Sequence, residues 1–140
     1  MRYFIIAGEA SGDLHGAALI EALRAEDPEA AFTFLGGDRM TAAAGCEPVI
    51  HNRDMAFMGF SEVLRNLGKI FGNMRRTRRA LAASGADCLI LIDYPSFNLK
   101  VAKTRAAGLL LHLAQDMGVE RVARKGHQED CRPYVLHSAL

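Results

Sequence analysis

Two stretches of the chain place reactive side chains directly after runs that are typical of β-strands. Residues 8–13 (GEASGD) follow the apolar run 3–7 and lead into a helical pattern that begins with Leu14. Asp93 follows the apolar run 88–92 (CLILI), which is typical of a strand buried on both faces of a parallel sheet. Ligands of parallel α/β sheets bind at the carboxyl ends of the strands. Both stretches are therefore candidates for a functional site.

The chemistry open to Asp93 is either general base catalysis or structural capping. A carboxylate at the carboxyl end of a central strand can take a proton from a ligand that lies over the sheet edge. The same side chain can instead cap the next helix or accept hydrogen bonds from loop N–H groups. These residues alone leave both roles open.

The glycine-containing stretch differs from the common phosphate-binding loops. A dinucleotide fingerprint requires G-x-G-x-x-G, and a P-loop requires Gly-Lys-Ser/Thr where this chain has Gly12-Asp13-Leu14. An aspartate at a helix N-terminus suits the positive end of the helix dipole but repels a phosphate. A polyhydroxylated ligand therefore fits better, while the alternative is that Ser11 and Asp13 only cap the helix.

The elements that must position these residues alternate between strands and helices. Strands are predicted at residues 3–7, 31–35, 48–50 and 88–92, and helices at residues 13–25 and 40–44. This alternation predicts an α/β fold with a Rossmann-like parallel sheet. If the first two strands are adjacent, Asp38 and Arg39 lie close to the first loop.

A basic amphipathic segment occupies residues 60–83. Six positive charges accompany apolar residues at helical spacing, namely Val63, Leu64, Leu67, Ile70, Phe71 and Met74. The apolar stripe either faces a membrane surface or packs on the sheet. Gly68 and Gly72 predict that two helices meet near them.

The composition is that of one ordinary domain with no bulk preference for nucleic acid. Its 140 residues are 50% hydrophobic and 24% charged, with a formal net charge of +1. Cys46, Cys88 and Cys131 have no C-x-x-C spacing, so reduced thiols are expected in place of disulfides or a zinc site. With no evident signal peptide or run of transmembrane length, a cytoplasmic location with peripheral membrane contact is expected.

Four motifs resemble, in the same order, those of the lipid-A-disaccharide synthase family. The members of this family are glycosyltransferases of lipopolysaccharide assembly. The motifs are GEASGD at residues 8–13, LGGDRM at residues 35–40, AFMGFSEVL at residues 56–64 and IDYPSFN at residues 92–98. The resemblance covers residues 1–108. It implies the N-terminal, acceptor-side half of a two-domain glycosyltransferase of the GT-B type, in which the absent second half makes most contacts with UDP.

The resemblance also implies a reaction that needs no cofactor. A UDP-2,3-diacylglucosamine donor loses UDP as the 6-hydroxyl of 2,3-diacylglucosamine 1-phosphate attacks with inversion at the inner leaflet of the inner membrane. One displacement requires one base, for which Asp93 is the candidate. The implied substrate-binding residues are Gly8, Glu9, Ser11, Gly12, Asp13, Met58, Gly59 and Asn98. The resemblance also favours the membrane interpretation, with Val63, Leu64, Leu67, Ile70 and Phe71 facing the lipid.

The chain departs from the family after residue 108. The family continues with a sequence of the type YYISPKIWAWKE, whereas this chain has no tryptophan and reads LHLAQDMGVER at residues 111–121. One codon choice for the family's sequence, read from its third base, translates into that same run. Residues 109–140 are therefore expected to be a frameshifted tail, and its Cys131, His127 and His137 are not expected to bind metal. The chain alone is expected to be inactive.

Two functions from other classes stay open on the sequence. A sugar-nucleotide epimerase of the same architecture would share the strands and loops but not the basic segment 60–83. A non-catalytic fragment that only binds lipid or membrane would tolerate the loss of Asp93.

Overall fold

A twisted parallel sheet positions every element of the candidate site. The structure, a computed structural model, describes residues 1–55, 67–93, 95–102, 110–114 and 121–123. The strands are β1 (Arg2–Ala7), β2 (Ala31–Gly36), β3 (Ile50–His51), β4 (Cys88–Ile92), β5 (Leu110–Ala114) and β6 (Arg121–Ala123). The helices are α1 (Ala10–Glu26), α2 (Asp38–Ala44), the short 3-10 helix η1 (Asn52–Asp54), α4 (Leu67–Ser84) and α5 (Pro95–Ala102).

The strand order is β3-β2-β1-β4-β5-β6, and only β6 runs antiparallel to its neighbour among the described strands. From β1 the chain first moves outward to β2 and β3, and then returns to the other side of β1 to form β4. The direction of winding therefore reverses between β1 and β4. The carboxyl ends of two strands at such a reversal form the usual ligand site of an open α/β sheet.

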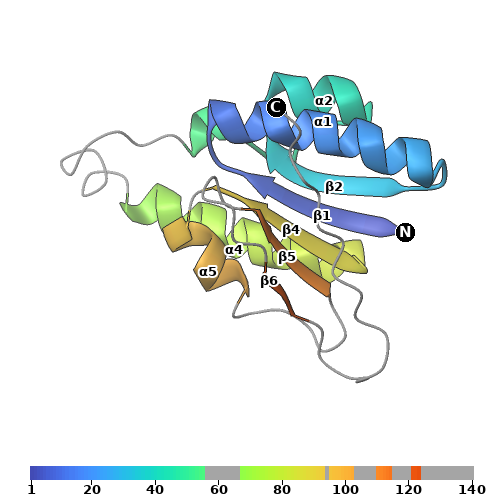
Figure 1. The fold of residues 1–140 in the computed structure, drawn as a ribbon. Coiled ribbons are helices and arrows are strands. Elements are labelled where there is room, and N and C mark those ends of the chain that lie inside the picture. Colours follow the sequence, from blue (N-terminus) through green and yellow to red (C-terminus); the bar gives the residue numbers. More distant parts are fainter. Residues whose placement is uncertain (56–66, 94, 103–109, 115–120, 124–140) are drawn as a thin grey trace.

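Helices cover both faces of the sheet, as Figure 1 shows, with α1 and α2 on one face and α4 and α5 on the other. Alternate residues of β1 face the two layers, as the pleat requires. Phe4 and Ile6 join the core that includes Met74 of α4, whereas Ile5 joins the core that includes Ile20 of α1. The predicted α/β fold with a Rossmann-like parallel sheet is thus confirmed.

The strand β4 lies in the centre of this core, and all five of its side chains are buried. Its predicted bounds, residues 88–92, are confirmed. Cys46 and Cys88 are free cysteines, and burial raises the pKa of the Cys88 thiol to about 11. Cys131 lies outside the described residues.

Two helices begin earlier than their sequence pattern predicts. The predicted start of α1 at Asp13 is wrong, because the N–H of Asp13 already donates the first helical bond to the carbonyl of Glu9 at 2.9 Å. Ser11 and Gly12 are therefore helical residues rather than loop residues. The helix α2 starts at Asp38 instead of residue 40 because its capping group comes from another element, as described below. The third strand is Ile50–His51, shifted from the predicted 48–50.

The helix α4 runs without a break from Leu67 through Gly68 and Gly72, so the prediction that two helices meet is wrong at Gly72, whereas the residues before Leu67 lie outside the described part of the chain. A side chain at either glycine would meet nothing within 4 Å, which places both on an open surface. The inner face of α4 packs Met74 and Leu81 against the sheet. Part of the apolar stripe is therefore core, as the alternative interpretation of this segment proposed.

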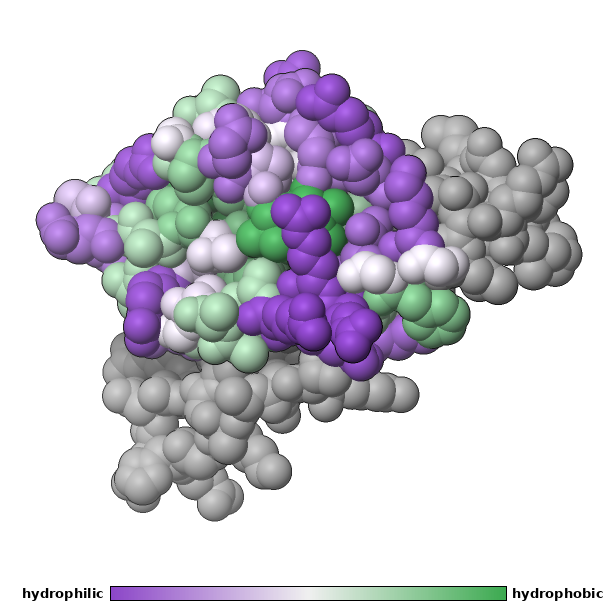
Figure 2. Space-filling view, turned by 180° about the vertical axis from the view of Figure 1, so that it is seen from behind, coloured by the Kyte–Doolittle hydropathy of each residue, from purple (hydrophilic) through white to green (hydrophobic). Residues whose placement is uncertain are grey.

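Few large hydrophobic side chains of the described residues are exposed. They are Met1 at 53%, Leu14 at 49% and Phe71 at 69%. Figure 2 shows the molecule from behind, where hydrophilic residues surround smaller hydrophobic areas. Phe71 on α4 is the most exposed of the three, and the same helix carries the exposed cations Lys69, Arg75, Arg76, Arg78 and Arg79.

Candidate functional site

The carboxyl edge of the sheet brings together the first turn of α1, the first turn of α2, the β3–η1 junction and the turn after β4. The parallel register pairs Ala7 of β1 with Ile92 of β4, so the residues that follow these strands leave the sheet side by side. Residues from three of the four sequence motifs therefore meet at this edge. The third motif, which includes Met58 and Gly59, lies outside the described residues.

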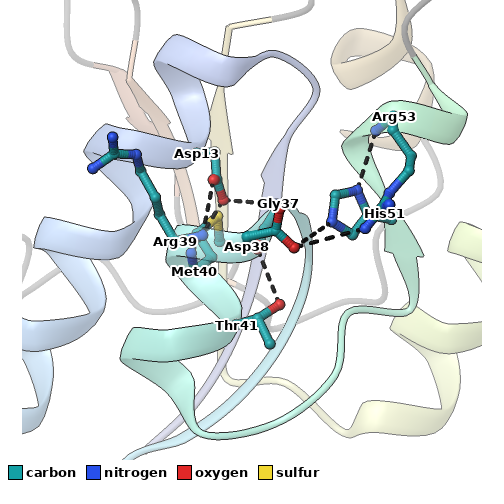
Figure 3. Close-up of polar contacts among 8 residues, drawn as sticks. All are labelled: Asp13, Gly37, Asp38, Arg39, Met40, Thr41, His51 and Arg53. Atoms are coloured by element: carbon teal, nitrogen blue, oxygen red, sulfur yellow. Dashed lines mark hydrogen bonds and ion pairs between the residues drawn. The ribbon is translucent and has the colours of Figure 1, made fainter.

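Asp13 is a buried carboxylate that caps α2 from the neighbouring helix. Its side chain is only 5% exposed and accepts hydrogen bonds from the backbone N–H groups of Gly37, Arg39 and Met40 at 2.6, 3.1 and 3.1 Å (Figure 3). These are the N–H groups that the start of a helix leaves without partners, and Gly37 at the N-cap has no side chain to serve them. Asp13 therefore has a structural role, because its side chain links α1 to the start of α2, 24 residues further along the chain.

The close approach of α1, β2 and α2 depends on glycines. A Cβ at Gly37 would lie 2.7 Å from both Oδ2 of Asp13 and Nδ2 of Asn52, so any side chain there would displace the capping carboxylate. Met40 is fully buried, and a Cβ at Gly16 or Gly36 would lie 2.5 Å from its sulfur. The LGGDRM motif is therefore explained by packing as well as by any contact with a ligand.

Asp38, His51 and Arg53 form a polar cluster that the sequence did not predict as a unit. Nε2 of His51 lies 3.1 Å from Oδ1 of Asp38, and Nδ1 of His51 accepts the backbone N–H of Arg53 at 3.3 Å. Because Nδ1 is an acceptor, Nε2 carries the proton that is donated to Asp38. The Arg53 guanidinium lies 3.7 Å from the same oxygen, and the Asp38 side chain is 88% exposed. The sequence signals for this cluster are that Asp38 follows the second predicted strand and that His51 directly follows the third, which was predicted at residues 48–50.

Asp93 adopts a left-handed backbone conformation directly after β4. Its φ of 53° is the only positive φ of a residue other than glycine among the described residues. Such a conformation costs a residue with a Cβ about 1–2 kcal/mol, although aspartate and asparagine tolerate it better than most. Strain of this kind concentrates at functional sites, where the surrounding structure maintains it.

Gly12 lets the half-buried Asp93 side chain pack against the first turn of α1. A Cβ at Gly12 would lie 3.0 Å from Oδ2 of Asp93, 3.3 Å from Cβ of Ala7 and 3.4 Å from Cγ2 of Ile92. A negative charge next to the N-terminus of a helix is electrostatically favourable. The N-cap residue Glu9 makes no capping bond with its own side chain. The GEASGD and IDYPSFN motifs thus come into contact at the point where the winding of the sheet reverses.

Asn98 lies beneath this turn. It is 2% exposed, and its amide nitrogen donates to the carbonyl oxygen of Ile92 at 3.3 Å and to that of Asp93. The resemblance implied that Asn98 binds substrate, but its amide group is buried against the backbone of the Asp93 turn.

The remaining predicted site residues divide into three groups. Gly8 is buried between β1 and α1, whereas Glu9 and Ser11 are exposed at the start of α1. Ile70 is half-buried and Phe71 is exposed on α4. Val63 and Leu64 lie outside the described residues, as does the side chain of Leu67.

The described residues contain no group of three or more His, Cys, Asp or Glu side chains placed to hold a metal ion. Within the same part of the chain, no helix is long and apolar enough to cross a membrane.

A parallel sheet with helices on both faces, and with Asp93 in a left-handed backbone conformation at its topological reversal, defines an α/β protein of the Rossmann-like class. The chain belongs to the lipid-A-disaccharide synthetase family, whose sequence model matches residues 3–111. The resemblance of the four motifs to this family is thereby confirmed.

Curated relatives agree with this assignment. The lipid-A-disaccharide synthase of Trichlorobacter lovleyi is 41% identical over 142 aligned residues, which cover 99% of this chain and 36% of the relative. Those of Acidobacterium capsulatum and Geobacter metallireducens are 46% and 42% identical and cover 72% and 88% of this chain, but only 25% and 33% of their own lengths. The chain thus spans about a third of the length of the curated relatives it matches.

The capping role of Asp13 makes a direct prediction about stability. Asp13→Ala removes the acceptor of three backbone N–H groups at the start of α2 and should cost about 2–4 kcal/mol of unfolding free energy. The matched change Asp38→Ala alters an exposed carboxylate and should change stability by about 0.5 kcal/mol or less. Urea unfolding followed by circular dichroism measures both. Equal stability of the two variants would contradict the structural role of Asp13.

Proposed function

We propose that this chain is the acceptor-side part of an inverting glycosyltransferase of lipid A biosynthesis, with Asp93 as its general base. The observation that carries the proposal is the position of the Asp93 carboxylate. It lies in a strained turn at the carboxyl end of β4, against the first turn of α1, in a chain of the lipid-A-disaccharide synthetase family.

The proposed reaction joins UDP-2,3-diacylglucosamine to 2,3-diacylglucosamine 1-phosphate. Asp93 accepts the proton of the acceptor's 6-hydroxyl as its oxygen attacks the anomeric carbon of the donor from the face opposite UDP. The bond from that carbon to the UDP oxygen breaks, and UDP leaves with the electron pair. One base is sufficient because the displacement occurs in a single inverting step.

The exposed residues at the start of α1 are suited to the acceptor side of this site. Glu9 and Ser11 offer hydrogen-bonding groups for sugar hydroxyls, and Gly8 and Gly12 let the backbone and Asp93 approach closely. Asp13 and Asn98 support the site from below, since their polar groups bond to backbone. The donor is proposed to bind mainly to a second domain that faces this one, so these 140 residues alone should not form the disaccharide.

Association with the inner leaflet of the inner membrane is proposed for α4. Phe71 is 69% exposed, and Arg75, one helical turn further along α4, is also exposed, a combination of an apolar anchor and positive charge that suits an anionic lipid surface. Such a surface is where diacylated substrates would be presented to the site.

The first test is Asp93→Asn in the full-length protein read in the family's frame. A general base contributes typically about 10²–10⁴-fold, so kcat should fall by that factor while the acceptor KM changes little. The matched control Glu21→Gln removes a charge from an exposed position of α1 and should retain wild-type kcat. Wild-type kcat in Asp93→Asn would remove Asp93 from the mechanism.

The membrane proposal is tested with vesicles that contain anionic phospholipid and no substrate. Phe71→Ser should weaken binding by about tenfold, since burying an aromatic side chain contributes roughly 1.5–3 kcal/mol and part of this ring is already covered by protein. Unfolding free energy should stay unchanged, because Phe71 already faces solvent. Leu14→Ser, an equally apolar change at an exposed site of α1, is the control. If Phe71→Ser and Leu14→Ser bind vesicles alike, α4 is not the lipid-facing element.

The tail is tested at the level of DNA. We propose that residues 109–140 arise from a shifted reading frame, which is supported by the codon coincidence at residues 111–121. Sequencing the gene across codons 100–115 should reveal an inserted or deleted base. Reversing that change should restore the family's tryptophan-containing continuation. A gene whose alternative frame contains no such continuation would contradict the proposal.

A further inference from the structure

The turn at Asp93 depends on a single buried amide. The φ and ψ angles of Asp93 describe rotations between the peptide unit that carries the Ile92 carbonyl and the peptide unit that carries its own carbonyl. The Asn98 amide nitrogen donates to both of these carbonyl oxygens. One side chain therefore fixes the two peptide units that define the left-handed conformation of Asp93.

The chemistry of this contact requires a group with two donors. A primary amide supplies two N–H bonds, whereas a carboxylate would repel both carbonyl oxygens and an alkyl group would leave them unpaired. The opposite amide orientation would place Oδ1 against the same two oxygens. In the observed orientation Oδ1 is buried and has no hydrogen-bond partner in the described part of the chain. The two N–H donors of the Asn98 amide thus explain why an asparagine occupies this position, whereas its Oδ1 contributes no hydrogen bond there.

We infer that Asn98 is a positioning residue that holds the Asp93 carboxylate at the sheet edge, and that it does not bind substrate itself. This inference rests on the proposed role of Asp93 as the base. Gly12 forms the opposite wall, because a Cβ there would lie 3.0 Å from Oδ2 of Asp93. The carboxylate therefore lies between its own backbone turn, which the Asn98 amide of α5 holds in place, and Gly12 of α1.

A double-mutant cycle in the full-length, in-frame protein tests the inference. Asn98→Leu preserves side-chain volume and removes both donors, so kcat should fall about 10- to 100-fold while the acceptor KM stays within about twofold. In the Asp93→Asn background, Asn98→Leu should cause no further loss, since it acts through the group already removed. Asn73→Leu is the matched control, because the Asn73 amide also donates to a backbone carbonyl, that of Asp54 at 3.1 Å, away from the site. It should keep wild-type kcat.

The outcomes separate this inference from the proposed function. A raised acceptor KM in Asn98→Leu, or a further loss of kcat in the double variant, would overturn the positioning role and favour direct substrate contact. Wild-type kcat in Asp93→Asn alone would instead overturn the general base.

A second measurement does not depend on activity. The scalar coupling between the amide proton and Hα of Asp93 reports φ, and Asn98→Leu should change it while Asn73→Leu should not. An unchanged coupling in Asn98→Leu would overturn the inference whatever the kinetics. If Asn98→Leu does not fold, Asn98→Ser, which keeps one donor, replaces it in both measurements and should show a smaller loss in the same direction.

Discussion

The left-handed backbone of Asp93 is the constraint on which the carboxyl edge of this protein depends. It directs the carboxylate away from the buried strand β4 and toward the first turn of α1, where the absence of a side chain at Gly12 leaves room for it. The conformation is unfavourable for an isolated aspartate, so it persists only because neighbouring groups favour it. The Asn98 amide of α5 bonds to both peptide units of the turn, and Gly12 of α1 leaves room for the carboxylate, which explains why motifs far apart in the sequence converge at this point.

Two aspartates in similar positions of the sequence have different surroundings. Asp13 and Asp93 each lie close to the carboxyl end of a parallel strand, yet Asp13 is buried with three backbone donors and Asp93 is half-buried. A buried carboxylate that accepts three backbone N–H groups is a poor candidate for proton transfer, because most of its lone pairs are already used. Asp13 therefore has the structural role of capping α2, and Asp93 is the candidate for proton transfer.

The sequence predicted the first four strands of the sheet, but not β5 and β6, which lie in the segment that was expected to be a frameshifted tail. Continuous apolar runs identify β1 and β4, and the glycine-containing stretches after strands locate the edge where ligands bind. It did not predict the partners of Asp13 or Asn98, because hydrogen bonds between a side chain and a distant backbone leave no periodic pattern. The start of α2 was missed for the same reason, since its cap is on another helix. On α4, helical periodicity identified the apolar positions but not their orientation, and only packing separates buried Met74 from exposed Phe71.

The role of Asp93 is tested most directly by a crystal structure of the full-length, in-frame protein with 2,3-diacylglucosamine 1-phosphate bound. We expect the 6-hydroxyl oxygen of the acceptor to lie about 3 Å from a carboxylate oxygen of Asp93, with Asp93 in its left-handed conformation and Asn98 beneath it. An acceptor whose 6-hydroxyl is held by another group, with the Asp93 carboxylate bonded only to protein backbone, would contradict the role of Asp93 as general base.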